Sequence, residues 1–378
     1  MSEIRGSLLF EEIIMENEQK KAGKIKKRAE ELFEQIREDR RYLHQIPEIG
    51  TDVPQTTAYI CRRLDEMGIP WQPCGGPLSE KMTEDYIRAG FPRMERATGV
   101  TAVIGKGEPC ILLRADMDAL PIKEENDLEF RSENGYGHMC GHDSHAAMLL
   151  GAARILKEME DELEGTVKLM FQPGEETGAG ARVLVENGAL ENPRPDAAFG
   201  LHVQSVDPTG RVGYAVGVNS SSLDTFIVKI KGKGGHSSQP QLCVDPLMIM
   251  NQLYQAVNLL ATREADPAAA VALTCGVAKG GTAVNIIPDE AELHIGLRTQ
   301  DVEAAARLTR RIPELVDHYV KAWNGEYEMT VFHTPCTWTD ETFCGEAVPY
   351  ISEIVGEDNV KQIPPMTGTE DFLSLIHI

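Results

Sequence analysis

The sequence predicts an α/β fold of two domains, and three observations lead to this expectation. At 378 residues the chain is longer than one hydrophobic core usually supports. Between residues 100 and 203, short apolar runs alternate with helix-like segments, which is typical of a sheet covered by helices on both faces. After Gly217 the order becomes strand, helix, strand, strand, helix, as in a compact α+β layer. We therefore expect an inserted domain at about residues 220–330, within a first domain of residues 1–219 and 331–378.

The first domain is expected to begin with two helices. Apolar residues recur at helical intervals from Lys21 to His44, and a second helix fits residues 56–67, which Gly68 and Pro70 terminate. Residues 73–77 are rich in proline and glycine and predict a turn. The remaining predicted elements are strands at 100–105, 109–114, 166–171 and 197–203 and helices at 146–159 and 179–187. In such a sheet, ligands bind at the carboxyl ends of the strands.

The inserted domain is expected to be ferredoxin-like. Residues 223–231 alternate between polar and apolar side chains, as a half-buried strand does. Further strands are predicted at 271–277 and 290–298, and helices at 246–260 and 302–323. This order resembles the split βαβ arrangement.

Charge and composition exclude several classes of partner. The chain has 37 Lys and Arg against 59 Asp and Glu, a formal net charge of −22, which disfavours binding to a phosphate backbone. It contains neither a signal-peptide core nor a run of about 20 apolar residues, so we expect a cytoplasmic protein that does not bind a membrane. Eight scattered cysteines without a CxxC pair are expected to be reduced, and most of them buried.

The densest cluster of reactive side chains is HMCGHDSH at residues 138–145. Cys140 and His142 lie on either side of a glycine, just before a predicted helix. Thiolate and imidazole are both good ligands for borderline divalent metals. A histidine-rich turn of no function is the alternative, but three histidines, a cysteine and an aspartate within eight residues favour a metal site.

Three more polar features follow predicted strands. Glu175 and Glu176 come after a Pro-Gly turn, where one carboxylate could bind metal while the other acts as a base, although such a pair is more often a solvated surface. His202 ends an apolar strand, where a single histidine is usually structural. Asp116 and Asp118 end another strand and are suited to holding a ligand imidazole in one tautomer.

Together these motifs resemble the metal-dependent aminoacylases of the M20 metallopeptidase family. The resemblance runs from about Arg40 to Phe372 and is closest to the branch of hippurate hydrolases, indole-3-acetyl-amino-acid hydrolases, N-acetyl-diaminopimelate deacetylases and aminobenzoyl-glutamate hydrolases. It depends on these segments: LHQIPEIG (43–50), RADMDALPI (114–122), GHMCGHDSH (137–145), FQPGEE (171–176), GLHV (200–203), GKGGHSS (232–238), TAVNIIPDEAELHIGLRT (282–299) and GTEDF (368–372). The implied fold is a metallopeptidase-type catalytic domain, with a mixed sheet between helices, and an inserted lid.

The resemblance implies the following roles at the metal centre. Cys140, His142, Glu176 and His202 would bind two divalent ions per subunit, and Glu175 would be the general base that takes a proton from a metal-held water. Manganese or zinc is expected, with nickel or cobalt as alternatives. The implied reaction is hydrolysis of the amide bond of a small N-acyl amino acid.

The resemblance also assigns residues around the centre and in the lid. Asp116, Asp118 and Asp143 would support the metal ligands from behind. The insert would form a homodimer, in which His236 reaches the partner's centre and stabilises the oxyanion. Asn285 and Arg298 would bind the substrate carboxylate, for which a guanidinium is well shaped, although a structural role for Arg298 is an equal alternative.

Two other functions remain open from the sequence. A metallo-dipeptidase or carboxypeptidase would use the same centre, and Cys140 with RADMDALPI favours the aminoacylase branch over it. A catalytically inactive, ligand-binding homologue is the second alternative, against which the intact Glu175 and Glu176 argue.

The end of the chain departs from the family pattern. After GTEDF the family continues with a strand, a helix and the last metal-ligand histidine, whereas here LSLIHI follows. These six residues are what CTG TCT CTT ATA CAC ATC encodes, the end sequence of a transposon used to prepare sequencing libraries. We hypothesise that the natural chain is longer and that His377 is not a ligand. A native stop codon directly after Ile378 in genomic DNA would contradict this hypothesis.

Overall fold

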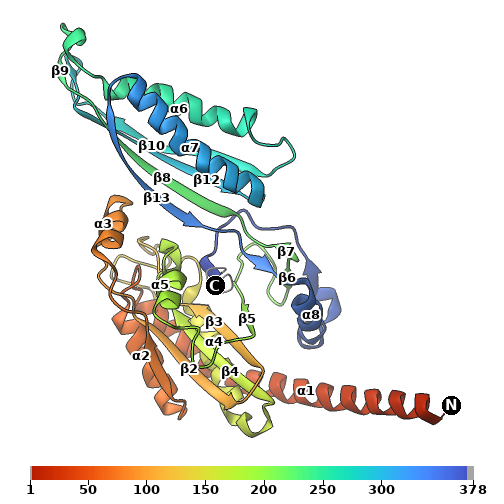
Figure 1. The fold of residues 1–378 in the computed structure, drawn as a ribbon. Coiled ribbons are helices and arrows are strands. Elements are labelled where there is room, and N and C mark those ends of the chain that lie inside the picture. The colour runs from red at the N-terminus through yellow and green to blue at the C-terminus, as the bar shows by residue number, and fades with distance from the viewer. Residues whose placement is uncertain (1, 373–378) are drawn as a thin grey trace.

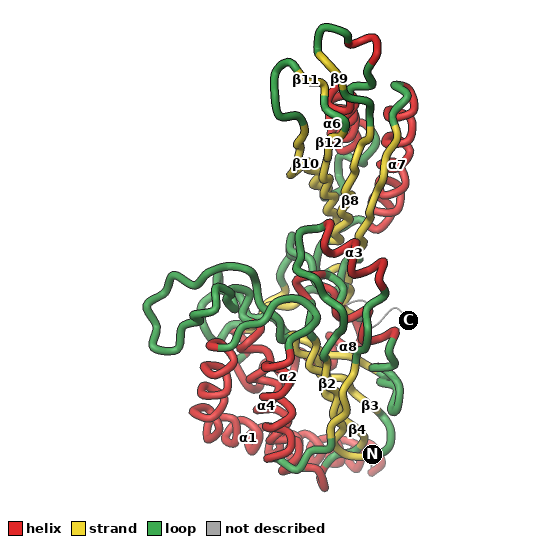
Figure 2. The backbone as a smooth tube through the Cα atoms, turned by 90° about the vertical axis from the view of Figure 1, so that its left-hand side faces the viewer, coloured by secondary structure: helices red, strands yellow, loops and turns green. Residues whose placement is uncertain are grey.

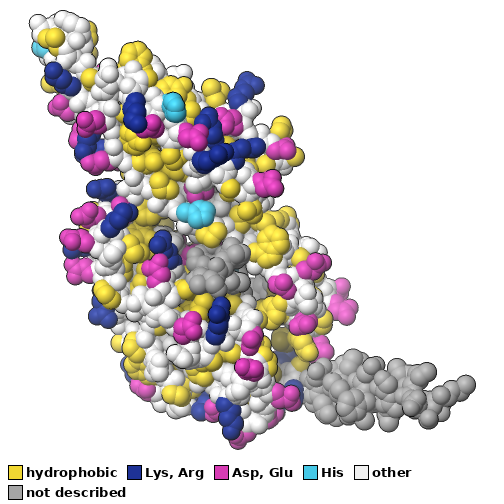
Figure 3. Space-filling view, in the orientation of Figure 1, with side chains coloured by type: hydrophobic (Ala, Val, Ile, Leu, Met, Phe, Trp, Pro, Cys, Tyr) yellow, Lys and Arg dark blue, Asp and Glu magenta, His cyan; other side chains and the backbone are white. Residues whose placement is uncertain are grey.

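The structure is a computed structural model that describes the backbone of residues 2–372 and the side chains of residues 21–372. His377 therefore lies outside the described residues. Two sheets dominate the fold, one in each half of the molecule (Figure 1). On the face drawn in Figure 3, Lys and Arg are interspersed with Asp and Glu. Among the described residues, no helix combines the length and apolar character needed to cross a bilayer.

The first sheet is mixed and has the strand order β1-β2-β4-β3-β5. Its strands are β1 (Trp71–Cys74), β2 (Gly99–Lys106), β3 (Cys110–Asp116), β4 (Gly165–Gln172) and β5 (Ala197–Gly200). β3 runs parallel to both β4 and β5, whereas β1 and β2 are antiparallel to their neighbours. The three parallel strands consequently end at one edge of the sheet.

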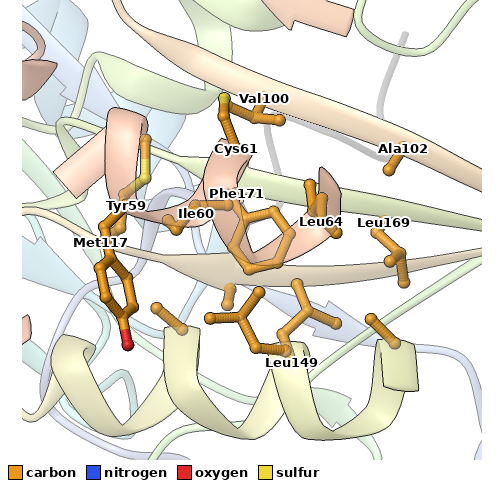
Figure 4. Close-up of a cluster of buried hydrophobic side chains, with 14 of the residues drawn as sticks. Tyr59, Ile60, Cys61, Leu64, Val100, Ala102, Met117, Leu149, Leu169 and Phe171 are labelled. Atoms are coloured by element: carbon orange, nitrogen blue, oxygen red, sulfur yellow. The ribbon is translucent and has the colours of Figure 1, made fainter. Parts of the chain in front are cut away.

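Helices cover both faces of this sheet. They are α1 (Ser2–Gln45), α2 (Pro54–Glu66), α3 (Glu80–Arg88), α4 (His142–Glu158) and α5 (Gly180–Glu186), while α8 (Glu341–Val355) lies to the side, against α1 and β15 (Val360–Gln362). Leu169 and Phe171 of β4 pack against α2 and α4 on one face (Figure 4). Met170, between them, packs with Leu184 of α5 on the other face. Successive strand side chains point to opposite faces, so both faces of β4 are apolar and buried.

The second sheet confirms the predicted ferredoxin-like topology. Its strands are β8 (Ser222–Lys231), β10 (Val271–Gly280), β12 (Glu290–Thr299) and β13 (Glu326–Thr334), all antiparallel in the order β10-β12-β8-β13. The helices α6 (Pro246–Arg263) and α7 (Val302–Ala322) bury their apolar sides against it. Because β13 continues to Thr334, the sheet extends past residue 330, and we propose the domain boundary after Thr334.

Short elements complete the described chain. β9 (Gly235–His236) and β11 (Ile286–Ile287) form a two-stranded ribbon at the far end of the second sheet (Figure 2). The other short elements are β6 (Val212–Tyr214), β7 (Gly217–Val218), β14 (Trp338–Thr339), β15 (Val360–Gln362) and single helical turns at Glu160–Glu162, Glu175–Thr177, Pro240–Leu242 and Glu357–Asn359.

Several elements differ from the sequence predictions, which also did not include helix α8. β1 passes through Pro73, where a turn was expected, because Pro73 lies on an edge strand and needs no second hydrogen-bonded neighbour. α3 and β13 were not predicted. α3 is a single short amphipathic segment, and β13 is recognisable mainly from its pairing with β8.

One ion pair within the second sheet predicts a pH-dependent stability. His333 of β13 lies opposite Asp224 of β8, and its Nδ1 donates to the buried Asp224 carboxylate at 2.6 Å. This hydrogen bond raises the pKa of His333 above its ordinary value, even though partial burial lowers it. The stabilisation is therefore fully present below about pH 6.5 and is lost as the pH rises through the raised pKa.

We expect His333→Gln to destabilise the protein most at pH 5.5 and progressively less towards pH 9. Urea unfolding of wild type and variant across this range measures the difference. A difference in unfolding free energy that is the same at every pH would contradict the assignment.

Candidate metal centre

The predicted ligands come together at the edge where β3, β4 and β5 end. Asp116 of β3 lies beside Gln172 of β4, and Arg114 of β3 lies beside Gly200 of β5. Residues that directly follow these strands therefore meet above this edge, as in other α/β sheets. The loop that precedes α4 delivers Cys140 and His142 to the same place.

A glycine makes this loop possible. Gly141 caps the N-terminus of α4 with φ of +92°, in the left-handed region that glycine adopts without steric cost. A Cβ atom at this position would lie 2.4 Å from Cγ2 of Val203. The close approach of the two chain segments brings Cys140 to His202, whose Nε2 lies 3.3 Å from the cysteine sulfur.

Two buried atoms in the centre have no hydrogen-bond partner among the described residues. They are Nε2 of His142 and Oε1 of Glu176, which lie 3.8 Å from each other. Burying a polar atom without a partner is costly, so such a pair points to a bound ligand between them. Cys140, His142 and His202 also have ligand atoms within 4.8 Å of one another, as do His142, Glu175 and Glu176. The donor set of the chain thus fits two divalent ions that share His142 as a neighbour.

The hydrogen bonds of His142 and His202 leave the Nε2 atom of each ring free to bind a metal. Nδ1 of His142 donates to the backbone carbonyl of Asp118 at 2.9 Å, and Nδ1 of His202 donates to the carbonyl of Val203 at 2.6 Å. A carbonyl can only accept, so Nδ1 carries the proton in each ring. Nε2 of both rings then offers its lone pair to a metal.

Asp116 and His145 form another cluster with His142, but their atoms are already engaged. Asp116 accepts from Arg114 at 2.7 Å and from Nδ1 of His145. Nε2 of His145 accepts the backbone N–H of Val203 at 2.9 Å. The carboxylate of Asp116 therefore orients His145, and through it the segment that carries His202, rather than orienting a predicted ligand directly.

Asp118 supports the centre through both its backbone and its side chain. Its backbone carbonyl accepts from Nδ1 of His142 at 2.9 Å, and Oδ1 of its carboxylate lies 3.6 Å from the same nitrogen. The carboxylate accepts the backbone N–H groups of Glu175 at 3.0 Å and of Glu176 at 3.2 Å. Asp118 thereby determines where the turn after β4 places both glutamates.

We expect Asp118→Ala to weaken metal binding by about 10–100-fold, the usual range for residues that position ligands. Competition with a chromogenic chelator measures the affinity. Asp196→Ala is the matched control, because Asp196 also accepts a backbone N–H, from Cys110 at the opposite end of β3. Equal losses in both variants would show that Asp118 acts only through general stability.

Asp143 lies behind the metal-binding loop, where its side chain contacts α1. Its Oδ2 accepts from Nδ1 of His44 at 2.8 Å and pairs with Arg40 at 2.8 Å. Nε2 of His44 lies 3.1 Å from Glu124. This buried chain ties the first turn of α4 to α1. The sequence motif around His44 was visible, but its role required the packing of α1 against α4.

Glu175 occupies an acidic, mostly buried position. Burial, followed by the nearby Glu370 and Asp371, raises the pKa of Glu175 well above its usual value, although Arg114 opposes this. Its Oε1 accepts the backbone N–H of Asp371 at 3.4 Å. A raised pKa makes a carboxylate a stronger base, as general-base catalysis requires.

Arg114 organises the acidic side of the centre, a role that was not predicted. It is buried and donates to Gln172 at 2.9 Å, Asp116 at 2.7 Å, Glu370 at 2.9 Å and Asp371 at 2.8 Å. One guanidinium thus connects β3 and β4 to the GTEDF segment. A charged residue inside the apolar run of β3 was the available signal.

The negative field of the centre favours a cation. Burial lowers the pKa of His142, but Asp116, Asp118 and Cys140 raise it, and the net shift is strongly upward. The carboxylates of Asp116 and Asp118 also attract a divalent ion to Nε2 of His142.

Of the residues predicted in the insert, His236 and Asn285 lie away from this centre, whereas Arg298 lies beside the GTEDF segment. His236 is exposed on β9, at the tip of the second sheet, and Asn285 precedes β11 there (Figure 1). Arg298 lies at the other end of β12, where its Nη1 donates to Thr369 at 2.6 Å. The structure therefore separates Asn285 from Arg298 within one chain and places His236 far from its own centre.

Comparisons with known proteins agree with this architecture. The family model described as Peptidase family M20/M25/M40 matches residues 112–377. An IAA-amino acid hydrolase of Arabidopsis thaliana is 35% identical over 342 residues, which cover 88% of this chain and 72% of the relative. An N-acetyl-L-cysteine deacetylase of Bacillus subtilis is 39% identical over 275 residues, which cover 72% of this chain and 61% of the relative.

A crystal structure has the same fold. It is that of a dinuclear metal binding peptidase of the M20 family from Bacillus subtilis, with a TM-score of 0.68 and 30% identity over 91% of this chain and 85% of that one. From its fold, its donor set and these similarities, the chain belongs to peptidase family M20/M25/M40.

Proposed function

We propose that the chain hydrolyses the amide bond of a small N-acyl amino acid at a centre of two divalent ions. The observation that carries the proposal is that Nε2 of His142 and Oε1 of Glu176 are buried without hydrogen-bond partners. Oε2 of Glu175 lies 3.9 Å from the same Nε2 atom. The names of the two relatives, an IAA-amino acid hydrolase and an N-acetyl-L-cysteine deacetylase, support a substrate in which an amino acid carries an acyl group.

We propose the following roles for the residues of the centre. Cys140, His142, Glu176 and His202 would hold the ions, which when bound supply Lewis-acid chemistry at the amide carbonyl and acidify a water ligand. Glu175 takes one proton from the attacking water and returns it to the leaving amine. Its raised pKa suits both steps, because the group must be basic first and acidic afterwards.

The metal is proposed to be manganese or zinc. A thiolate and two imidazoles suit zinc, whereas the carboxylate ligand also suits manganese. Nickel and cobalt fit the same donors as alternatives.

The active form is proposed to be a homodimer joined through the second sheet. Within the described chain, β10 is paired on one side only and exposes backbone donors and acceptors along its other edge. The neighbouring helix α6 presents the exposed apolar side chains Tyr254 and Leu259. The eight free cysteines support a reducing, cytoplasmic setting as part of the same proposal.

His236 is suited to act on a partner's substrate. Its Nδ1 accepts the backbone N–H of Ser238 at 3.2 Å, so the proton of the neutral ring is on Nε2. An Nε2–H group on an exposed strand at the lid tip can donate to a developing oxyanion.

Metal analysis combined with a hydrolysis panel tests the proposal. We expect about two divalent ions per chain and chelator-sensitive release of amino acid from hippurate and related N-acyl amino acids. Preferential cleavage of unblocked dipeptides would favour a dipeptidase instead. Metal binding without turnover of any amide would identify an inactive, ligand-binding homologue.

A further inference from the structure

His44 lies between two buried carboxylates, those of Glu124 and Asp143. Its side chain is only 4% exposed, and both acidic residues are buried as well. Nδ1 of His44 lies 2.8 Å from Oδ2 of Asp143, and Nε2 lies 3.1 Å from Oε1 of Glu124. One imidazole ring thus connects two acidic side chains that are 19 positions apart by their numbering.

Asp143 accepts from His44 as a carboxylate. Its Oδ1 accepts the backbone N–H of Ser144 at 2.9 Å, and its Oδ2 pairs with Nε of Arg40 at 2.8 Å. Both oxygens are therefore acceptors, and Nδ1 of His44 carries the hydrogen of their contact. Because Asp143 directly follows His142 in the first turn of α4, this contact holds the segment that carries a predicted metal ligand.

Glu124 is the second acceptor and lies in a closed loop. Leu120 and Gly137 exchange two backbone hydrogen bonds of 3.1 Å, which join the ends of this loop directly before the metal-binding residues. Oε2 of Glu124 accepts the backbone N–H of Ser132 at 2.8 Å. Burial raises the pKa of Glu124, but the hydrogen bonds from Ser132 and His44 lower it, and the net shift is downward. Glu124 is therefore ionised, and Nε2 of His44 donates to it.

A histidine that donates from both nitrogens is an imidazolium. Burial lowers the pKa of His44, but the hydrogen bonds to Asp143 and Glu124 raise it, and the net shift is upward. With Arg40, the ring supplies two positive charges to two buried negative ones. Removing one member of such a buried group leaves the others uncompensated, which is costly.

We propose that His44 is a positioning residue of the metal centre, because it anchors the start of α4 through Asp143 and the preceding closed loop through Glu124. The segment between these two anchors carries the predicted ligand Cys140. It is therefore held on both sides before an ion binds, which reduces the cost of ordering the ligands. This inference rests on the proposed metal centre, but not on the proposed reaction.

Two substitutions of His44 separate its contacts. Asparagine places an amide N–H near the position of Nδ1, and glutamine places one near the position of Nε2. His44→Asn thus keeps a donor for Asp143, whereas His44→Gln keeps a donor for Glu124. We expect His44→Gln to weaken zinc binding by about 10–100-fold, the usual range for residues that orient ligands. His44→Asn should weaken it less, because the start of α4 remains held.

Competition with a chromogenic chelator measures the affinity for zinc alone, and amide hydrogen exchange of the metal-free proteins measures each anchor. His44→Gln should accelerate exchange of the Ser144 amide, and His44→Asn should accelerate that of the Ser132 amide. Each change should be about tenfold, because a hydrogen bond to a charged group is lost beside that amide. His333→Gln is the matched control, since it removes a histidine that donates to the buried Asp224 in the second sheet, and it should leave zinc affinity unchanged.

Glu124→Gln provides the same test if the His44 variants do not fold. It keeps the shape of the side chain but removes its charge, and it should accelerate exchange at Ser132 and not at Ser144. An exchange pattern that does not distinguish the two amides would overturn the inference.

Zinc affinity that stays at the wild-type value in both His44 variants would also overturn the inference, and so would equal losses in the two. Neither result affects the proposed hydrolysis, which is measured by turnover. Conversely, a wild-type protein that binds zinc but cleaves no amide would refute the proposed hydrolysis. The loss of zinc affinity in His44→Gln would then still support the positioning role.

Discussion

Glu175→Gln is expected to lower kcat by about 10²–10⁴-fold while the protein keeps its two metal ions. Glutamine has nearly the shape of glutamate but cannot accept a proton at neutral pH. The backbone N–H of Glu175, which Asp118 accepts, is unaffected by the substitution. Metal content by atomic emission and turnover of hippurate measure the two properties separately.

Glu176→Gln should behave in the opposite way and lose metal. Its Oε1 is buried without a hydrogen-bond partner 3.8 Å from Nε2 of His142, and the proposed ligand role would supply the missing partner. Because the two glutamates are adjacent and share the Asp118 support, each variant is the control for the other. Equal metal loss in both would refute this division of roles.

Mixed dimers are expected to restore activity that neither parent has. His236→Ala subunits retain Glu175, and Glu175→Gln subunits retain His236. If His236 acts across the dimer, each hybrid contains one complete site, formed by Glu175 of one chain and His236 of the other. The loss in the His236→Ala homodimer should be about 10²–10³-fold, the usual value for removal of an oxyanion donor.

The hybrid dimers must be identified and quantified independently of their activity. Subunits with two different affinity tags are mixed, with the His236→Ala form in excess, and the doubly tagged dimers are isolated and assayed. If these hybrids are as inactive as both parents, His236 acts within its own chain or does not act in catalysis. His236 is exposed at the tip of the second sheet, away from the metal centre of its own chain. We therefore expect the hybrids to be active.

Much of the fold could be predicted because its signals are local. Leu169 and Phe171 alternate with Met170 in an apolar run, which is sufficient to identify a strand buried on both faces. The β8 alternation and the two long amphipathic helices likewise identify the inserted layer. β13 and the edge strand through Pro73 were missed because their stability comes from pairing with distant strands.

The candidate site was likewise predictable only where its signals are local in the sequence. The sequence by itself determined which residues are candidate ligands, Cys140, His142, Glu176 and His202, from their chemistry, from their positions before a predicted helix or after predicted strands, and from the resemblance of their motifs to the M20 family. Only the tertiary structure decided what supports them. Asp118 holds the two glutamates by their backbone, Asp116 holds His145, and Arg114 joins two strands to residues 370 and 371.

The same structure separated residues that the motifs had grouped. Asn285 precedes β11 and β12, and Arg298 lies near the end of β12. The two residues are therefore far apart, because an extended strand carries the chain about 3.3 Å per residue away from its start. Hydrogen-bond partners and distances between segments far apart in sequence depend on how the sheets and helices pack. The periodicity of apolar residues and the residue types depend on only a few neighbours in the sequence. They therefore predict local structure and chemistry, but they do not predict that packing.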